Sequence, residues 1–217
     1  MRFEIPDLLS PEERHQILSV LETAEFVDGK LTAGWYAKQV KHNEQLKSAD
    51  AKALKEQIKT ALQKHPLFQS AVRPRQIHTI LLSRYEMGMS YGTHADNALM
   101  RQYRADVSFT LFLNGPEAYE GGELVIEGAD DEQVYKLPAG TGLFYPSSTL
   151  HRVNEVTQGV RFVAVGWVQS WVRDPAQREI LFDLDTARRS LFAQQGKTAE
   201  FDLISKSISN LLRRWAA

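Results

Sequence analysis

The spacing of apolar and polar positions changes twice along the chain, and the first stretch has helical periodicity. Ser10, Pro11 and Glu13 form the pattern of a capping box with proline at the first helical position, so a helix is predicted from Pro11. Apolar residues recurring three and four apart predict a second helix over about 48–63. Residues 26–47 show no sustained period and are expected to be irregular or weakly stranded.

From residue 76 apolar positions alternate with polar ones, which is the period of a β-strand. The alternating segments are short, and Gly, Pro and Asn stand between them, as in Gly115-Pro116 and Gly121-Gly122. Many short strands separated by such turns indicate a β-sandwich or jelly roll. The expected strands are 76–85, 107–114, 123–127, 134–137, 142–145, 150–156 and 161–168.

Helical spacing returns after Trp171. Asp174-Pro175 is the pattern of an N-cap followed by proline, and Gly196 is expected to end the helix that begins there. A last amphipathic helix is expected around residues 201–212. The fold class is therefore α+β with a mainly β core. Three parts are expected: a helical N-terminal layer over 1–75, a β core over 76–170 and a helical C-terminal unit over 171–217.

Composition and charge exclude several kinds of partner and several kinds of reactive site. The formal net charge of −1 provides no overall field that would attract nucleic acid or an anionic membrane. The chain has no cysteine, which excludes disulfides, thiolate metal sites, iron–sulfur clusters and cysteine nucleophiles. No stretch approaches the roughly 18 apolar residues of a membrane span, and the N-terminus lacks the apolar run of a signal peptide. A cytoplasmic location is therefore expected.

A candidate metal site lies in the second half of the chain. His94 and Asp96 stand two residues apart before a predicted strand, and in extended backbone such side chains point to the same face. By itself this triplet is more often a loop histidine beside a solvated acid than a metal site. His151 lies on a later short strand that a rolled-up sheet can bring alongside. Two imidazoles and one carboxylate can occupy one face of an octahedral ferrous ion. We therefore predict that His94, Asp96 and His151 bind the metal and are the catalytic residues.

Arg161 follows His151 by ten residues and begins an apolar segment that reaches Trp167. A surface arginine in a salt bridge is one interpretation. The apolar segment instead favours a core-facing strand, where the guanidinium needs a defined partner, and its planar fork can bind a carboxylate bidentately. Together with the three metal ligands, this indicates an iron(II)- and 2-oxoglutarate-dependent oxygenase. Among the other histidines, His15, His42 and His65 are expected at the surface, and His78 within a strand.

An ordered set of residues extends this pattern through the predicted β core. It consists of Tyr85-x-x-Gly88-x-x-Tyr91-x-x-His94-x-Asp96, the strand 107–114, Gly121-Gly122-Glu123-Leu124, His151, and Arg161 ahead of Trp167. The set resembles the prolyl/lysyl-hydroxylase-type iron(II)/2-oxoglutarate-dependent dioxygenases over roughly residues 76–170. The whole chain is similar to the bacterial group called PKHD-type hydroxylases.

This resemblance implies a double-stranded β-helix, the jelly-roll core of that superfamily. It implies iron held by the three residues named above, and 2-oxoglutarate held through Arg161. L-ascorbate is implied as the agent that returns oxidised iron to the ferrous state. Animal oxygen-sensing relatives tend to carry a tyrosine where Phe112 stands here, so Tyr85 is expected to offer the hydroxyl group to the distal carboxylate.

Several functional questions stay open in the sequence. The hydroxylated substrate is either a protein side chain or a small molecule, with molecular oxygen as co-substrate. Tyr91 is expected at the rim of the cleft, and Asn97 and Arg152 adjoin metal ligands. One alternative is a cupin-like metal-binding isomerase or ligand sensor, which does not require Arg161; another is an inactive binding module, against which the intact triad argues. The C-terminal helices could pack on the core, contact a partner or form a homodimer, and we favour the homodimer.

Overall fold

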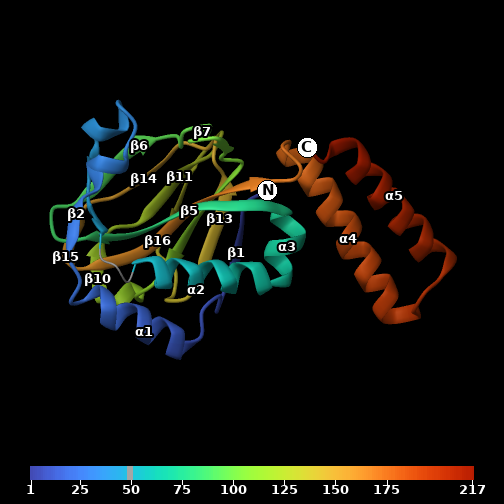
Figure 1. The fold of residues 1–217 in the computed structure, drawn as a ribbon, viewed down its shortest axis with the longest axis horizontal. Helices are drawn as coiled ribbons and strands as arrows, with labels where there is room; N and C mark the ends of the chain where they lie inside the picture. Colours follow the sequence, from blue (N-terminus) through green and yellow to red (C-terminus); the bar gives the residue numbers. More distant parts are fainter. Residues whose placement is uncertain (48–50) are drawn as a thin grey trace.

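Two facing antiparallel β-sheets form the centre of the protein, and a helical hairpin extends from one end (Figure 1). The computed structural model describes residues 1–47 and 51–217. The larger sheet has seven strands in the order β1-β13-β9-β16-β5-β4-β2, and the smaller has five in the order β12-β11-β14-β6-β3. Strands distant in sequence are neighbours in both sheets, so the expected β-sandwich of the double-stranded β-helix type is confirmed.

All seven expected strands are present, with 150–156 divided between β14 and the start of β15. The larger sheet contains β1 (Phe3–Ile5), β13 (Gly142–Pro146), β9 (Val107–Phe112), β16 (Arg161–Ser170), β5 (Pro74–Tyr85), β4 (Glu44–Leu46) and β2 (Phe26–Asp28). The smaller contains β12 (Glu132–Tyr135), β11 (Leu124–Glu127), β14 (His151–Val153), β6 (Ser90–His94) and β3 (Lys41–His42). Two small pairs are β10 (Tyr119–Gly121) with β15 (Val156–Gly159), and β7 (Leu99–Met100) with β8 (Tyr103–Arg104). Short 3₁₀ turns are η1 (Gly29–Thr32), η2 (Ala37–Gln39) and η3 (Pro116–Ala118).

Alternating side chains of the larger sheet face two different neighbours. In β9, Phe109 and Leu111 belong to the apolar core that includes the N-terminal helices. Ser108 and Thr110, between and beside them, line the space that faces the smaller sheet. Arg161 occupies the same inward position in β16. Because successive side chains of a strand point to opposite faces, polar residues reach the space between the sheets while their neighbours pack on the helices.

Three helices lie in the N-terminal region, α1 (Pro11–Leu21), α2 (Ala51–Lys64) and α3 (Pro66–Val72). The predicted capping box of α1 is present: Glu13 N donates to Ser10 Oγ at 3.2 Å, and Ser10 N donates to Glu13 Oε2 at 2.8 Å. The second expected helix corresponds to α2, although its expected start at Ser48 lies outside the described residues. Helix α3 was not expected, because seven residues are too few to establish a helical period.

The segment before residue 76 contains strands as well as helices. β1 pairs with β13 at one edge of the larger sheet, and β4 pairs with β5 near the other. β3 instead joins the smaller sheet by pairing with β6. The helical layer expected over 1–75 therefore also contributes strands to both sheets, and three of them, β2, β3 and β4, lie in the segment 26–47 that was expected to be irregular or weakly stranded. Because residues 41–46 cross from the smaller sheet to the larger one, they close one side of the space between the sheets.

The C-terminal unit is a hairpin of α4 (Pro175–Gln195) and α5 (Ala199–Trp215), which projects from one end of the sandwich (Figure 1). Asp174 caps α4 and Gly196 ends it, as predicted. The hairpin has a small apolar cluster of its own, Val172, Leu181 and Ile208. Homodimerisation through it stays a prediction. In the parts of the chain that the structure describes, no helix combines the length and apolar character needed to cross a membrane.

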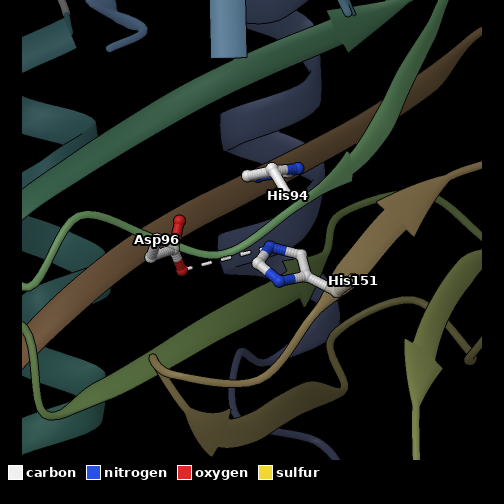
Figure 2. Close-up of side chains that lie close together, drawn as sticks. All are labelled: His94, Asp96 and His151. Atoms are coloured by element: carbon white, nitrogen blue, oxygen red, sulfur yellow. Dashed lines mark ion pairs between the residues drawn. The ribbon is translucent and has the colours of Figure 1, made fainter. Parts of the chain in front are cut away.

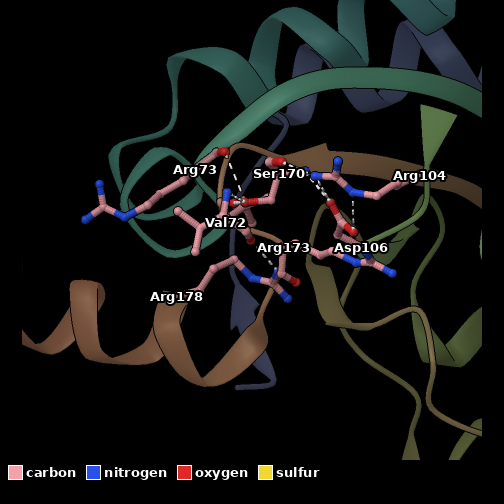
Figure 3. A network of polar contacts seen from close by, with 8 residues as sticks. Val72, Arg73, Arg104, Asp106, Ser170, Arg173 and Arg178 are labelled. Atoms are coloured by element: carbon pink, nitrogen blue, oxygen red, sulfur yellow. Dashed lines mark hydrogen bonds and ion pairs between the residues drawn. The ribbon is translucent and has the colours of Figure 1, made fainter. Parts of the chain in front are cut away.

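Buried polar contacts join this hairpin to the larger sheet (Figure 3). Arg178 is 4% exposed, and its Nη1 donates to the carbonyl oxygens of Val172 and Arg173, each at 2.8 Å. Ser170, at the end of β16, donates its backbone N–H to Asp106 Oδ2 at 2.9 Å. Since a guanidinium buried without acceptors would be costly, the contacts of Arg178 fix the start of α4 to the segment that follows β16.

Candidate metal centre and adjoining cavity

Three side chains from the smaller sheet and the loop that follows β6 converge between the sheets. His94 in β6 lies directly opposite His151 in β14, and their ring centroids are 4.3 Å apart. Asp96 follows the end of β6 by two residues, and its Oδ2 lies 4.0 Å from His151 Nε2. Figure 2 shows the three side chains pointing toward one another. Their potential ligand atoms all lie within 4.8 Å of one another, so the structure brings together the three predicted metal ligands.

Each histidine ring is oriented by a backbone carbonyl. His94 Nδ1 lies 2.9 Å from the carbonyl oxygen of Gly92, and His151 Nδ1 lies 3.0 Å from that of Thr149. A carbonyl can only accept, so Nδ1 of each ring carries a proton and donates it to this oxygen. Nε2 is therefore the nitrogen that is free to bind a metal, which is the arrangement that carbonyl partners usually impose on metal-binding histidines.

The carboxylate of Asp96 is oriented from the opposite sheet. Ser108 in β9 donates its hydroxyl to Asp96 Oδ2 at 2.6 Å, and Ser147 Oγ lies 2.8 Å from Ser108 Oγ. One hydroxyl has one proton to give, so Ser108 receives its own hydrogen bond from Ser147. This relay links the loop after β6 to the larger sheet and holds one carboxylate oxygen in place.

Burial sets the protonation state of His94. It lowers the pKa of His94 to about 4, because the imidazolium form loses hydration, and the neighbouring His151 lowers it further. The nearby Asp96 acts in the opposite direction but is the smaller effect. At neutral pH the ring is uncharged, which is the form that binds a divalent metal ion.

Tyr91 and Lys41 lie on one side of this centre. The Tyr91 ring stacks on His94 with centroids 3.7 Å apart and an interplanar angle of 17°. Lys41 is the cross-strand partner of Tyr91, and its Nζ lies 5.1 Å from the Tyr91 ring centroid. Tyr91 therefore packs against a predicted ligand and also lines the cavity, as expected for a residue at its rim.

A cavity of about 460 Å³ adjoins the three side chains. Its walls come from both sheets and from the segment that contains η1 and η2. This volume falls within the range of roughly 300–1,000 Å³ that is common for small-molecule sites. His94, Asp96, His151 and Arg161 all line it. The predicted metal ligands and the predicted carboxylate-binding arginine therefore share one cavity.

Arg161 is a buried cation without a counter-ion in the described part of the chain. Its side chain is 1% exposed, and none of its three guanidinium nitrogens has a hydrogen-bond partner there. Its Cζ lies 5.0 Å from the ring centroid of Tyr85 and 5.6 Å from that of Phe112. The interpretation as a surface arginine in a salt bridge is therefore wrong. Because an uncompensated buried charge is unfavourable, this environment fits an anionic ligand.

Tyr85 and Gly122 complete the surroundings of Arg161. Tyr85 lies opposite Arg161 in the pairing of β5 with β16 and is 3% exposed. Burial raises the pKa of the Tyr85 phenol, while the positive charge of Arg161 opposes this shift, so the phenol keeps a proton that it can donate. Gly122 has φ 66°, and a Cβ there would lie 3.1 Å from Arg161 Cδ and 2.8 Å from Val156 Cγ2. Glycine at this position leaves room for the aliphatic part of the Arg161 side chain.

Of the other residues considered in the sequence analysis, Asn97 lies at the cavity, and Arg152 and the remaining histidines lie elsewhere. Arg152 adjoins His151 in β14, but its guanidinium pairs with Glu132 at 2.6 and 2.7 Å and does not line the cavity. His15 and His42 are exposed, His65 is half-buried at the start of α3, and His78 is half-buried with its ring stacked on Tyr103.

A polar part of the cavity wall was missed from the sequence. Lys41, Asn43 and Gln45 are buried alternately along residues 41–46, and Ser83 is buried beside them in β5. Their period of two was visible, but polar residues at that period ordinarily indicate an exposed edge. Their burial depends on how the segment bridges the two sheets, which the sequence does not specify.

Comparison with known proteins agrees with this geometry. Residues 80–169 match the family model of the 2OG-Fe(II) oxygenase superfamily, and residues 175–217 match that of the PKHD-type hydroxylase C-terminal domain. PKHD-type hydroxylases of Picosynechococcus sp. and Gloeothece citriformis are each 66% identical to this chain over the full length of both proteins. One from Synechococcus elongatus is 60% identical, also over the full length of both.

Solved structures share the fold at much lower identity. A Pseudomonas putida prolyl-4-hydroxylase has a TM-score of 0.55 and 18% identity, covering 78% of this chain and 92% of its own. A Trichoplax adhaerens prolyl hydroxylase, solved with a hypoxia inducible factor peptide fragment, has a TM-score of 0.58 and 15% identity over 78% and 83% of the two chains. A non-heme alpha ketoglutarate dependent epimerase from nogalamycin biosynthesis has a TM-score of 0.55 at 15% identity, over 79% and 78%. One fold thus serves different reactions.

Proposed function

This chain belongs to the PKHD-type hydroxylases of the 2OG-Fe(II) oxygenase superfamily, and from this premise we propose that it hydroxylates a C–H bond of its substrate with release of succinate and carbon dioxide. The observation that carries this proposal is the buried guanidinium of Arg161, which faces the cavity that His94, Asp96 and His151 also line. A cupin-like isomerase or sensor does not require an arginine at this position.

In this proposal His94 Nε2, His151 Nε2 and an oxygen of Asp96 hold ferrous iron. The donor set fits, because each imidazole uses Nδ1 for a backbone carbonyl and leaves Nε2 for the metal, and one carboxylate lowers the net charge of the site. Ser108 keeps the carboxylate in position through its 2.6 Å hydrogen bond. These contacts orient the ligands before the metal binds, so little reorganisation is needed.

Arg161 and Tyr85 hold the distal carboxylate of 2-oxoglutarate. The guanidinium supplies charge-assisted hydrogen bonds, and the protonated phenol of Tyr85 can add a further one. When bound, ferrous iron and 2-oxoglutarate supply the oxidising chemistry: one atom of O₂ enters the substrate as a hydroxyl group and the other enters succinate, with loss of carbon dioxide. Binding one end of the co-substrate at Arg161 orients its keto acid end within the cavity.

Apolar side chains limit access of water to this region. Phe112, Leu124 and Val163 are fully or almost fully buried in the cluster between the sheets. A dry environment strengthens the attraction between Arg161 and a carboxylate. L-ascorbate would act as a reductant that returns oxidised iron to the ferrous state, and no side chain is assigned to it.

Isotope labelling tests the proposed reaction. Protein incubated with Fe(II), 2-oxoglutarate, ascorbate and ¹⁸O₂ should produce succinate that carries one ¹⁸O atom, even before the acceptor is known. His151→Ala should form none above the background without protein. Unlabelled succinate from the wild-type protein would contradict the proposal.

A further inference from the structure

Lys41 is a second buried cation of the cavity. Its side chain is 5% exposed, and its Nζ donates to Thr32 Oγ1 at 3.2 Å. No ion pair joins it to a carboxylate within residues 1–47 and 51–217; Asp96 and Asp28 influence it only from a greater distance. Burial lowers the pKa of Lys41 to about 8, so the amine is still mainly protonated at neutral pH. An ammonium group in this environment favours an anionic ligand.

Gln45 and Ser83 add two unpaired polar groups to the same wall. They are direct partners in the pairing of β4 with β5, and they are 4% and 1% exposed. Gln45 Oε1 accepts from Thr32 Oγ1 at 2.8 Å, and the same hydroxyl accepts from Lys41. Gln45 Nε2 and Ser83 Oγ have no partner in the described structure. An ammonium, an amide N–H and a hydroxyl are therefore available side by side.

This wall adjoins the surroundings of Arg161 in the same cavity but consists of different side chains. Ser83 precedes Tyr85 by two residues in β5, and Tyr85 is the residue opposite Arg161. Two residues of a strand span roughly 6.6 Å. If iron and 2-oxoglutarate are bound, the metal and Arg161 balance the charges of Asp96 and the two carboxylates of the co-substrate. The charge of Lys41 then needs a different anion.

We propose that Lys41, Gln45 and Ser83 bind a carboxylate group of the substrate. The inference rests on the proposed function, because only then is Arg161 already occupied by 2-oxoglutarate. A carboxylate matches the single charge of Lys41, whereas a phosphate dianion would leave a buried negative charge uncompensated. The carboxylate would orient the substrate so that one of its C–H bonds faces the metal centre. The substrate class is thus an organic acid, an amino acid or an acidic peptide.

A binding experiment without turnover tests this subsite. Mn(II)-loaded protein with saturating 2-oxoglutarate is kept anaerobic. Paramagnetic relaxation is measured at the protons of N-acetylglycine and N-acetylglycinamide and at the phosphorus nucleus of inorganic phosphate. Lys41→Met removes the charge, and Lys38→Met makes the same change at an exposed lysine of η2. Separate samples of each protein receive Fe(II) in place of Mn(II) and are tested for the visible band that Fe(II) and 2-oxoglutarate should produce together.

We expect saturable relaxation of N-acetylglycine with the wild-type protein and Lys38→Met, and at least tenfold weaker binding with Lys41→Met. The amide should not bind measurably. The subsite is overturned if acid and amide bind equally, if Lys41→Met binds the acid as the wild type does, or if the acid shows no saturable binding. If inorganic phosphate binds more tightly than N-acetylglycine, the proposal that the subsite binds a carboxylate is overturned. Absence of the visible band in the wild-type protein contradicts the proposed function instead.

Discussion

His94 and His151 are directly opposite residues of two neighbouring antiparallel strands, β6 and β14. One strand register therefore fixes the relative position of two of the three proposed metal ligands. A slip of one residue would turn one imidazole to the other face of the sheet, because side chains alternate along a strand. Asp96 lies in the loop beyond β6 and takes its orientation from Ser108 in the other sheet. The centre thus depends on both sheets being assembled.

Ser108→Ala should weaken iron binding by about 10- to 100-fold, because loss of a partner that orients a metal ligand typically has this effect. Anaerobic titration with Fe(II) measures the change. Ser148→Ala is a suitable control, since Ser148 is exposed. Unchanged iron affinity in Ser108→Ala would show that Asp96 does not need the relay or is not a ligand.

Arg161→Ala should weaken binding of 2-oxoglutarate by about 100-fold while iron affinity changes little. Charge-assisted hydrogen bonds contribute roughly 1.5–3 kcal/mol each, and Arg161 is not one of the proposed metal ligands. Arg152→Ala removes an arginine that pairs with Glu132 instead of lining the cavity, so it should leave 2-oxoglutarate affinity unchanged. Equal loss of both affinities in Arg161→Ala would contradict the assignment.

Tyr85→Phe should raise the dissociation constant of 2-oxoglutarate by roughly tenfold, the effect of one hydrogen bond to a charged group. The substitution keeps the ring beside Arg161, so the melting temperature should change little. Titration monitored by the visible band measures the affinity. An unchanged dissociation constant would show that Tyr85 does not bind 2-oxoglutarate and that Arg161 binds its distal carboxylate without Tyr85.

Metal-free protein should lose stability as pH falls from about 6.5 toward 4. Burial holds the folded-state pKa of His94 near 4, below the value of about 6.5 for an unfolded chain, so the unfolded state binds the proton first. The contribution of neutral His94 to the free energy of unfolding is fully present above the unfolded pKa, and it declines as pH falls through this window. Thermal unfolding with a chelator should therefore show a flatter pH dependence for His94→Gln than for the wild type. Identical slopes would contradict this explanation.

The sequence was most informative where chemistry and period coincide. His94, Asp96 and His151 were recognisable because their types suit a ferrous ion, and Arg161 because a charge opens an apolar strand. The alternation in 107–114 predicted strand β9, and the apolar run after Arg161 predicted the core-facing strand β16. Local signals such as the capping box at Ser10 were specific enough to place a helix start.

Features that depend on tertiary contacts were missed. β6 has Tyr91 as its one large apolar residue, so no alternation marked it as a strand, although it carries His94. The polar residues Lys41 and Gln45 are buried only because residues 41–46 bridge the two sheets. The cross-strand register of His94 and His151 likewise follows from sheet assembly, which no local pattern encodes.

The central claim is that one cavity binds a ferrous ion through His94, Asp96 and His151 and 2-oxoglutarate through Arg161. Anaerobic addition of Fe(II) and 2-oxoglutarate to the wild-type protein tests it most directly. We predict a visible metal-to-ligand charge-transfer band that saturates at one equivalent of iron and is absent in His94→Ala. A well-folded protein that develops no band would contradict the claim.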